Sequence, residues 1–341
     1  MTDRTAGAAR GRPRRTSFAV AFGLAASMAV GALASLPAGA QSPYPQRPVM
    51  LIVPYGAGGI ADTGMRIVAD KLGTRLGQQF VVDNRPGAGG IIAAKAGSSA
   101  APDGYTLLMT GNNNAISEAL FKSLPYNILS DFVSTSTTSF FDLLIVAREG
   151  SPLGSLQDVI KAAKTSPGKL NIGTINPGST QNLAAELFRS TAGVDVTIVP
   201  FRTSPDMAGA ILRGDLDIAF EFYAALQGQI LDHKVRVLAS TGARRTAYLP
   251  DVPTVEESGI KGYEVASWNG ISVPAGTPKP VVDTLNRAIN EVLPLPDVQE
   301  KSRRLGMDMR ASTPEDMTAR MKSDIAKWAA VIEKAGIPKR D

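Results

Sequence analysis

The feature that most restricts the fold of this chain is a repeated unit, in which a short apolar run leads into a polar or glycine-rich loop and then into an amphipathic helix. The first copy begins with the apolar run 49–53 and continues through the loop 54–59. Five apolar residues then recur at helical spacing, namely Met65, Val68, Ala69, Leu72 and Leu76. This alternation predicts an α/β fold of parallel strands joined by right-handed crossovers, with the loops along one edge of the sheet.

The unit recurs later in the chain. Further loops of this kind lie at 83–90, 110–114, 174–181 and 201–206. Beyond residue 253 the chain offers one long extended segment, 263–273, followed by three helical patterns that end at residue 337. Because this tail holds too few strands for a third sheet, we expect it to return and pack on the first domain.

A returning tail requires the chain to cross between domains twice, near residues 141 and 265. We therefore predict one domain of residues 41–141 and 266–341, and a second domain of residues 142–265. Ligands of open α/β sheets bind beyond the carboxyl ends of the strands. Two such edges joined by a hinge predict a cleft that closes on its ligand like a clamshell.

The first forty residues are typical of a secretory leader. Five arginines precede an apolar run at 18–36, and Ala38-Gly39-Ala40 has the small residues of a cleavage site. We expect cleavage after Ala40 and a soluble, periplasmic mature protein. The pair Arg14-Arg15 matches the twin-arginine pattern loosely, so both export routes stay open.

Composition argues against several classes of function. The leader holds five of the 36 basic residues and one of the 31 acidic ones, so the mature chain is nearly neutral and a nucleic-acid partner has no support. Cysteine is absent, and the single histidine, His233, lies between two charged residues and is expected in solvent. A catalytic triad therefore lacks its base. We predict no enzymatic activity, no metal and no cofactor.

The glycine-rich loop is the first candidate for a binding site. Gly56, Gly58 and Gly59 lack a Cβ and precede a helix N-terminus, where free N–H groups attract anions. Asp62 either contacts the ligand or caps its helix. Two alternatives stay open: a turn that simply needs glycines, or a dinucleotide site, since Gly56-x-Gly58-x-x-Ala61 with Asp83 fits that fingerprint.

Other candidates follow the later apolar runs. Neutral side chains suited to reversible hydrogen bonding are Asn112, Asn113, Asn176, Ser179, Thr180, Gln181, Thr203 and Ser204. Glu221 comes just after an apolar run and either faces the cleft or is solvated. Trp268 lies on the expected hinge strand and either lines the cleft or packs in the core.

Five segments together resemble the Bug family, the extracytoplasmic solute receptors of tripartite tricarboxylate transporters. They are residues 53–62, 83–90, 101–108, 249–254 and 273–278. The resemblance implies a two-domain periplasmic-binding-protein fold of the Venus flytrap kind, type II-like. It also implies a small organic carboxylate (mono-, di- or tricarboxylate, or an aromatic acid) as ligand, delivered to membrane transporter subunits by a monomeric receptor. The alternatives are a receptor that instructs a signalling partner and an exported dinucleotide-dependent enzyme.

Carried onto this chain, the family's first binding loop is Tyr55 to Thr63, which includes Tyr55, Gly58, Gly59, Ala61, Asp62 and Thr63. The other loops fall on the polar residues named above. Several positions depart from the usual family residues, namely Ala57, Asn182, Arg202, Thr203, Glu221 and Asn269. The resemblance therefore leaves the identity of the ligand open.

Overall fold

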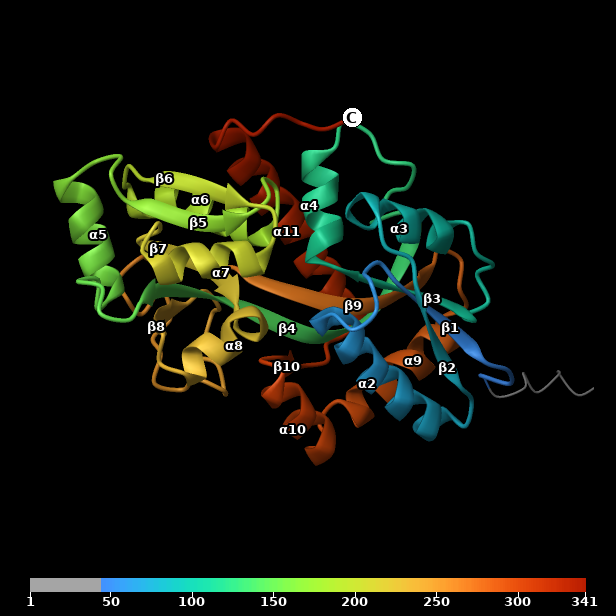
Figure 1. Cartoon of the computed structure of the whole chain (residues 1–341). Helices are drawn as coiled ribbons and strands as arrows, with labels where there is room; N and C mark the ends of the chain where they lie inside the picture. Colours follow the sequence, from blue (N-terminus) through green and yellow to red (C-terminus); the bar gives the residue numbers. More distant parts are fainter. Residues whose placement is uncertain (1–43) are drawn as a thin grey trace, which may run out of the picture. The chain divides into compact units, whose positions relative to one another are not determined.

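The computed structural model describes residues 44–341 (Figure 1), so the predicted leader and its cleavage site lie outside the described residues. Residues 44–341 form one compact unit. No helix in this part of the chain is both long and apolar enough to cross a membrane.

The order of elements follows the repeated unit predicted from the sequence. The strands are β1 (Val49–Val53), β2 (Phe80–Asn84), β3 (Thr106–Gly111), β4 (Phe132–Arg148), β5 (Asn171–Ile175), β6 (Thr197–Phe201), β7 (Ile218–Phe222), β8 (Val235–Ser240), β9 (Ala266–Pro274) and β10 (Asp308–Met309). The helices are α2 (Ile60–Leu76), α3 (Ile91–Ser98), α4 (Asn112–Leu120), α5 (Leu156–Thr165), α6 (Thr180–Ala192), α7 (Ser204–Arg213), α8 (Tyr223–Leu231), α9 (Lys279–Val292), α10 (Pro296–Arg304) and α11 (Pro314–Lys334), with a short 3₁₀ turn η1 (Ala88–Gly90) before α3.

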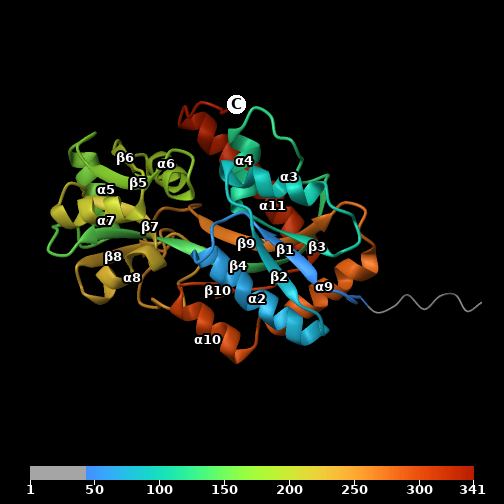
Figure 2. The same cartoon turned by 45° about the vertical axis from the view of Figure 1, so that its right-hand side comes forward.

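The strands form one mixed sheet in the order β2-β1-β3-β9-β4-β7-β5-β6, with β8 and β10 also paired to β4. Pairing is parallel within β2-β1-β3 and within β7-β5-β6, as the alternating pattern predicts. The prediction of parallel strands is wrong for β4, β8, β9 and β10, which pair in antiparallel fashion. Of these strands, β9 and β4 lie between the two parallel groups in the sheet (Figure 2).

The partner of β4 changes at one point along its length. Residues Phe132 to Asp142 pair with β9, whereas Leu143 to Arg148 pair with β7 and β8. Strand β9 begins at Ala266, opposite Asp142. Residues 141 and 265, near which the sequence predicts crossings between domains, lie beside the change of partner on β4 and the start of β9. The division into two domains stays a prediction.

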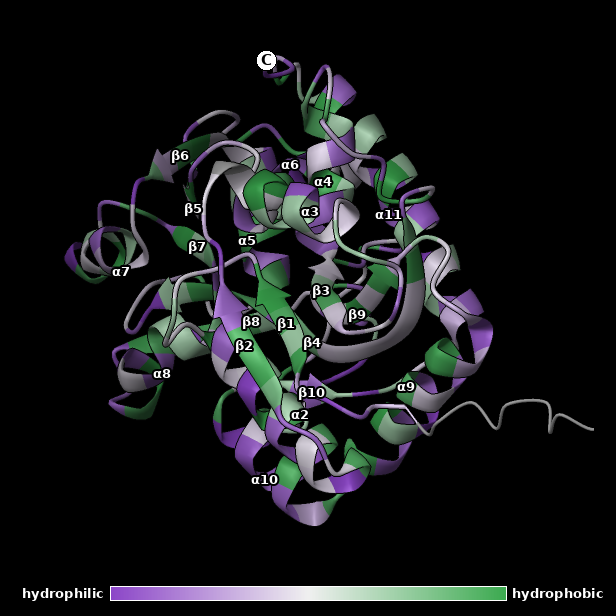
Figure 3. Cartoon of the chain, turned by 90° about the vertical axis from the view of Figure 1, so that its right-hand side faces the viewer, coloured by the Kyte–Doolittle hydropathy of each residue, from purple (hydrophilic) through white to green (hydrophobic). Residues whose placement is uncertain are grey.

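Helices cover both faces of the sheet. One hydrophobic core includes residues from both groups of strands, and two further cores lie on one group each. The stripe predicted on α2 is buried at Met65, Val68, Ala69 and Leu72, where it packs with β1 and α9. The strand β1 is coloured as hydrophobic in Figure 3, while the outer surfaces of α2 and α10 carry many hydrophilic residues. Residues 143–147 of β4 are fully buried, which explains their unbroken apolar run.

Trp268 lies in the core and does not line the cleft. Its side chain is fully buried, and Nε1 donates to Asp324 Oδ2 on α11 at 2.6 Å. The neighbouring β3 approaches so closely that a Cβ on Gly111 would lie 2.1 Å from the carbonyl oxygen of Trp268. Helix α4 starts directly after Gly111, without the loop expected at 110–114, so this contact fixes where α4 begins.

We expect Gly111→Ala to lower the free energy of unfolding by about 2 kcal/mol or more, because the added methyl group meets backbone that cannot rotate away. Urea unfolding followed by circular dichroism measures the change. The matched control is Gly228→Ala on α8, where nothing lies within 4 Å of the added Cβ. A helical Gly→Ala change stabilises by up to about 1 kcal/mol. Equal stabilities for the two variants would contradict the close approach of β3 and β9.

Candidate binding cleft

The candidate site is a pocket of about 450 Å³ beyond the carboxyl end of β1, where the two groups of strands meet. Its wall comes from the loop before α2, the N-terminus of α6, and the strands β4, β7 and β9. The lining residues are Tyr55, Gly56, Gly59, Ile60, Ala61, Phe141, Ser179, Thr180, Gln181, Phe222, Ser267 and Asn269. None of these side chains carries a formal charge.

Two loops that enter the pocket have the same local structure although they belong to different groups of strands. The backbone N–H of Gly58 donates to Asp62 Oδ2 at 2.8 Å, and that of Gly178 donates to Asn182 Oδ1 at 3.0 Å. Both glycines are in the left-handed region, with φ of 83° and 81°. In each case a side chain in the first helical turn ties back the glycine that precedes the helix. We call this contact the loop brace.

The loop braces leave two helix N-termini facing one pocket. Helix α2 has Gly59 as its N-cap, so no side chain satisfies the N–H groups of its first turn. In α6 the Ser179 hydroxyl accepts from the N–H of Asn182, which leaves the N–H groups of Thr180 and Gln181 without a side-chain cap. Free N–H groups and the helix dipole together attract negative charge. The pocket can therefore bind anions at two places without a cationic side chain.

Asp62 holds the first loop in place through hydrogen bonds of its carboxylate. Its carboxylate is buried and accepts from Arg66 Nε at 2.9 Å and from Asn84 Nδ2 at 2.8 Å, in addition to the N–H of Gly58. Burial alone raises the pKa of this carboxyl, but the hydrogen bonds from Arg66, Asn84 and Gly58 outweigh it and hold the pKa below its usual range. Asp62 is thus ionised, its carboxylate is hydrogen-bonded to Gly58, Arg66 and Asn84, and it does not line the pocket.

Part of the pocket lining is apolar. The rings of Phe141 on β4 and Phe222 on β7 meet edge to face, with centroids 6.5 Å apart. Tyr55 lies at the rim with 36% of its surface exposed, and Ile60 adds an aliphatic side chain. The two anion-attracting helix ends are therefore combined with an aromatic surface, which suits a ligand that has an apolar body.

Glu221 is buried behind the pocket. It neither faces the cleft nor is solvated, which were the two possibilities left open by the sequence. It lies inside β7, and its carboxyl accepts from Gln181 Nε2 at 2.9 Å, from the Ser204 hydroxyl at 2.6 Å and from the N–H of Phe222 at 2.7 Å. Burial raises the pKa of Glu221, and these three hydrogen bonds oppose the shift. Through Gln181 and Phe222, Glu221 positions two residues that line the pocket.

The structure brings some of the predicted residues together in the pocket and places others around it. Tyr55, Gly59, Ala61, Ser179, Thr180 and Gln181 line it. Gly58 and Asp62 form a loop brace, and the N–H of Thr63 donates to the carbonyl oxygen of Gly59. Asn176 and Thr203 are exposed, and Thr203 caps α7 instead.

Asn112 and Asn113 do not line this pocket. Asn112 is buried, accepts from Trp328 Nε1 at 2.7 Å and donates to Thr180 Oγ1 at 3.1 Å, so it links α4 and α11 to the start of α6. Asn113 lines a separate pocket of about 250 Å³ that shares Ser179 and Thr180 with the first. Asn112 acts on the site through Thr180.

Sequence reasoning missed the aromatic part of the site. Phe141 and Phe222 were not proposed as lining residues, and Asn269 was noted only as a departure from the family pattern. Phe141 lies at the predicted crossing near residue 141, and Phe222 follows Glu221 directly. Their position at a crossing between strand groups was therefore the available signal.

The side chains that catalysis or a cofactor would need are placed as follows. His233 is exposed, as predicted, at the end of α8. Within residues 44–341, no group of three or more histidine and acidic side chains could hold a metal ion. Asp83, the acidic residue of the dinucleotide alternative, is paired with Arg85 at 2.8 Å.

Comparison with known proteins places this geometry in context. Residues 65–337 match a family model described as "Tripartite tricarboxylate transporter family receptor". The solved structure of the R. palustris protein Rpa4515 with adipate is 32% identical, with a TM-score of 0.73, and covers 87% of this chain and 99% of its own. The structure of the periplasmic binding protein BugD is 31% identical, with a TM-score of 0.70 over 87% of this chain and all of its own.

A third solved structure is MatC from Rhodopseudomonas palustris with bound malate. It is 29% identical, has a TM-score of 0.69, and covers 85% of this chain and 100% of its own. These similarities confirm the predicted periplasmic-binding-protein fold. The matched proteins are receptors and binding proteins, which argues against the dinucleotide-dependent enzyme.

We expect Asp62→Asn to lower the free energy of unfolding at neutral pH by about 1–3 kcal/mol, the usual value of a hydrogen bond to a charged group. Because the folded state lowers the pKa of Asp62, its contribution is present above the ordinary pKa of about 4 and is lost as the pH falls below it. Urea unfolding at a series of pH values measures this.

The difference between the native protein and Asp62→Asn should therefore shrink in acid. Asp83→Asn is the matched control, because Asp83 forms a partly exposed ion pair with Arg85 and should contribute about 1 kcal/mol or less. A difference for Asp62→Asn that stays constant down to strongly acidic pH would show that the carboxylate is not the stabilising species.

Proposed function

Because the chain belongs to the receptor family of tripartite tricarboxylate transporters, we propose that it is a periplasmic receptor that captures a small organic dicarboxylate in its cleft and delivers it to the membrane subunits of such a transporter. The observation that carries the proposal is the pair of helix N-termini, α2 and α6, that open on one uncharged pocket. Each end can hold one carboxylate group on backbone N–H groups.

The domain boundaries are part of the proposal. We assign residues 41–141 and 266–341 to one domain and residues 142–265 to the other, because β4 changes partner after Asp142 and β9 starts at Ala266. Each domain then contributes one braced helix start to the pocket. Closure of the hinge would bring the two N-termini onto opposite ends of the ligand.

The apolar part of the pocket lining favours a dicarboxylate whose two carboxylate groups are joined by an apolar body. Phe141 and Phe222 line the same pocket as the two helix ends, so a methylene or aromatic body placed against their rings is removed from water. A relative binds adipate, whose six-carbon chain has this character, and another binds malate, which is shorter and carries a hydroxyl group. We propose that this receptor prefers the adipate-like class.

Export and assembly complete the proposal. We propose that the leader is removed after Ala40 and that the mature receptor acts as a monomer. A receptor that instructs a sensor protein is the second candidate, since closure on a ligand could be read by either partner. The presence of two genes for membrane transporter subunits beside the gene for this chain would favour transport.

A thermal-shift panel of mono-, di- and tricarboxylates, aromatic acids and dinucleotides tests the ligand class. At one hundred times its dissociation constant, a ligand stabilises the folded state by about 2.7 kcal/mol. For a chain of this size we expect adipate-like dicarboxylates to raise Tm by roughly 5–10 °C. A rise with dinucleotides alone would overturn the receptor function, and a rise with tricarboxylates alone would overturn the preference for an apolar body.

We expect Gly58→Val to abolish dicarboxylate binding, measured by calorimetry, because a β-branched residue disfavours a φ of 83° and its side chain enters the open space of the loop. Gly77→Val is the matched control. Gly77 follows the other end of α2, has a φ of 74° and also has open space at its Cβ. Both variants should lose similar stability, and only Gly58→Val should lose binding. Unchanged affinity in Gly58→Val would remove this loop from the site.

A further inference from the structure

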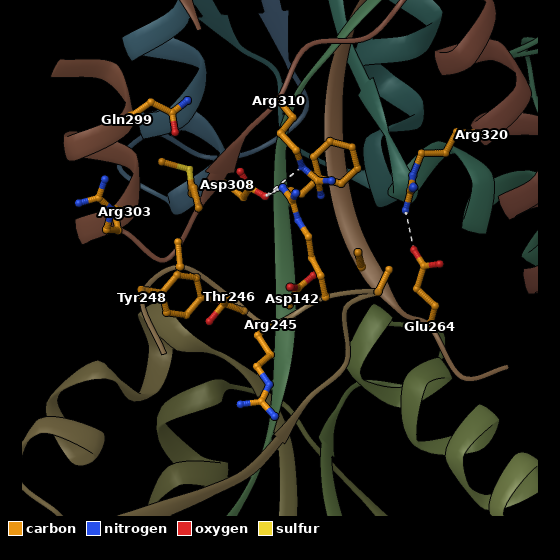
Figure 4. A pocket seen from close by; sticks show the side chains of 16 residues that line it. Asp142, Arg245, Thr246, Tyr248, Glu264, Gln299, Arg303, Asp308, Arg310 and Arg320 are labelled. Carbon is orange, nitrogen blue, oxygen red and sulfur yellow. Dashed lines mark hydrogen bonds and ion pairs between the residues drawn. The ribbon is translucent and has the colours of Figure 1, made fainter. Parts of the chain in front are cut away.

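A second pocket lies on the opposite face of the same strands. It has a volume of about 310 Å³ and shares no lining residue with the cleft (Figure 4). Side chains alternate between the two faces of a strand. Phe141 and Ser267, which are paired across β4 and β9, line the cleft, whereas the next pair, Asp142 and Ala266, lines the second pocket. We call it the rear pocket.

The rear pocket is rich in arginine. Five arginines line it, against three carboxyl groups: Arg244, Arg245, Arg303, Arg310 and Arg320 face Asp142, Glu264 and Asp308. Arg245 and Arg303 are paired outside the pocket, with Glu257 and Glu300. The remaining guanidinium groups therefore decide the charge inside.

Those guanidinium groups are incompletely neutralised. Arg244 and Arg310 share a single carboxylate, Asp308, at 2.7 and 2.9 Å. Arg320 lies 3.6 Å from Glu264 and 3.8 Å from Asp324, and both distances are longer than a hydrogen bond. The side chains of Arg310 and Arg320 are held over the ring of Phe140, 4.1 and 5.0 Å from its centre. Stacking fixes a guanidinium plane while leaving its N–H edge free for an anion.

Asp142 completes the lining of the rear pocket. Its carboxyl forms no hydrogen bond or ion pair within residues 44–341. The pKa of Asp142 is raised to about 7, mainly by burial; Asp308 and Glu264 add to the shift, and Arg310 and Arg244 oppose it. Near neutral pH a large fraction is protonated and can donate a hydrogen bond. The buried Tyr248 hydroxyl, beside Thr246, is another donor without a partner of good geometry.

We propose that the rear pocket is a second binding site, which takes a small tetrahedral dianion such as sulfate or inorganic phosphate. The anion would accept from Arg310 and Arg244, and from the carboxyl of Asp142 in its protonated form. Arg244 precedes Arg245 in the segment after β8, while Arg310 follows β10, so the anion would join two segments far apart in the sequence. The proposal does not depend on which ligand the cleft binds.

Calorimetric titration of the purified protein with sulfate at constant ionic strength tests the proposal. We expect saturable binding that Arg310→Gln weakens about tenfold or more, since a charge-assisted hydrogen bond is lost. Arg244→Gln serves as a second variant, because 62% of this side chain is exposed and its loss should not disturb folding. The matched control is Arg75→Gln, an exposed arginine paired with Glu291 on the surface.

The pH dependence supplies an independent readout. Sulfate does not titrate near neutrality, so its affinity should fall as the pH rises through the pKa of Asp142 of about 7 and the carboxyl ionises. Asp142→Asn keeps a neutral donor and should bind sulfate with little change over the same range. The exposed His233 remains in both proteins and cancels in the comparison.

Three results would overturn the proposal. In the first case, sulfate would give no saturable heat at concentrations up to tens of millimolar. In a second case, an excess of the cleft dicarboxylate, or Gly58→Val, would abolish sulfate binding, which would place the anion in the cleft. In the third, Arg75→Gln would weaken binding as much as Arg310→Gln does, which would show screening without a site.

Discussion

The antiparallel pairing of β4 with β9 is the contact on which the rest of this structure depends. Both strands run between the two parallel groups, and their pairing ends where β4 changes partner, after Asp142. Because side chains alternate along a strand, one residue pair faces the cleft and the next faces the rear pocket. A shift of register by one residue would exchange Phe141 with Asp142 and would place a carboxyl among the aromatic residues of the cleft. The buried Trp268, bonded to Asp324, and the close approach at Gly111 hold this register.

The pockets on the two sides of the sheet attract anions by different groups. In the cleft, the proposed anion binding relies on backbone N–H groups next to the loop braces, and the lining contains no formal charge. Such an arrangement requires little desolvation of charged side chains, which suits a receptor that must release its ligand. In the rear pocket, guanidinium groups stacked on Phe140 supply the positive charge, and a carboxyl with a pKa of about 7 adjusts it. The rear pocket therefore responds to pH in the neutral range.

The local parts of the site were accessible to sequence reasoning. The loop before α2, the loop before α6 and the helix stripe of α2 all depend on residues within a few positions of one another, and the structure contains them. The roles of Asp62 and Glu221 were left open by the sequence. Each is decided by partners distant in the chain: Asn84 for Asp62, and Gln181 and Ser204 for Glu221. The same holds for Asn112, whose partners are Thr180 and Trp328.

By itself, the sequence determined the repeated units of strand, loop and helix, the glycines that precede two helices, and the absence of catalytic histidine and cysteine chemistry, because these follow from local periodicity and residue type. Only the tertiary structure decided which loops share a pocket, that β4 and β9 run antiparallel, and that Phe141 and Phe222 meet while Arg244 and Arg310 converge on Asp308. The physical reason is that burial and pairing between distant segments depend on the register of the whole sheet, which no local pattern specifies.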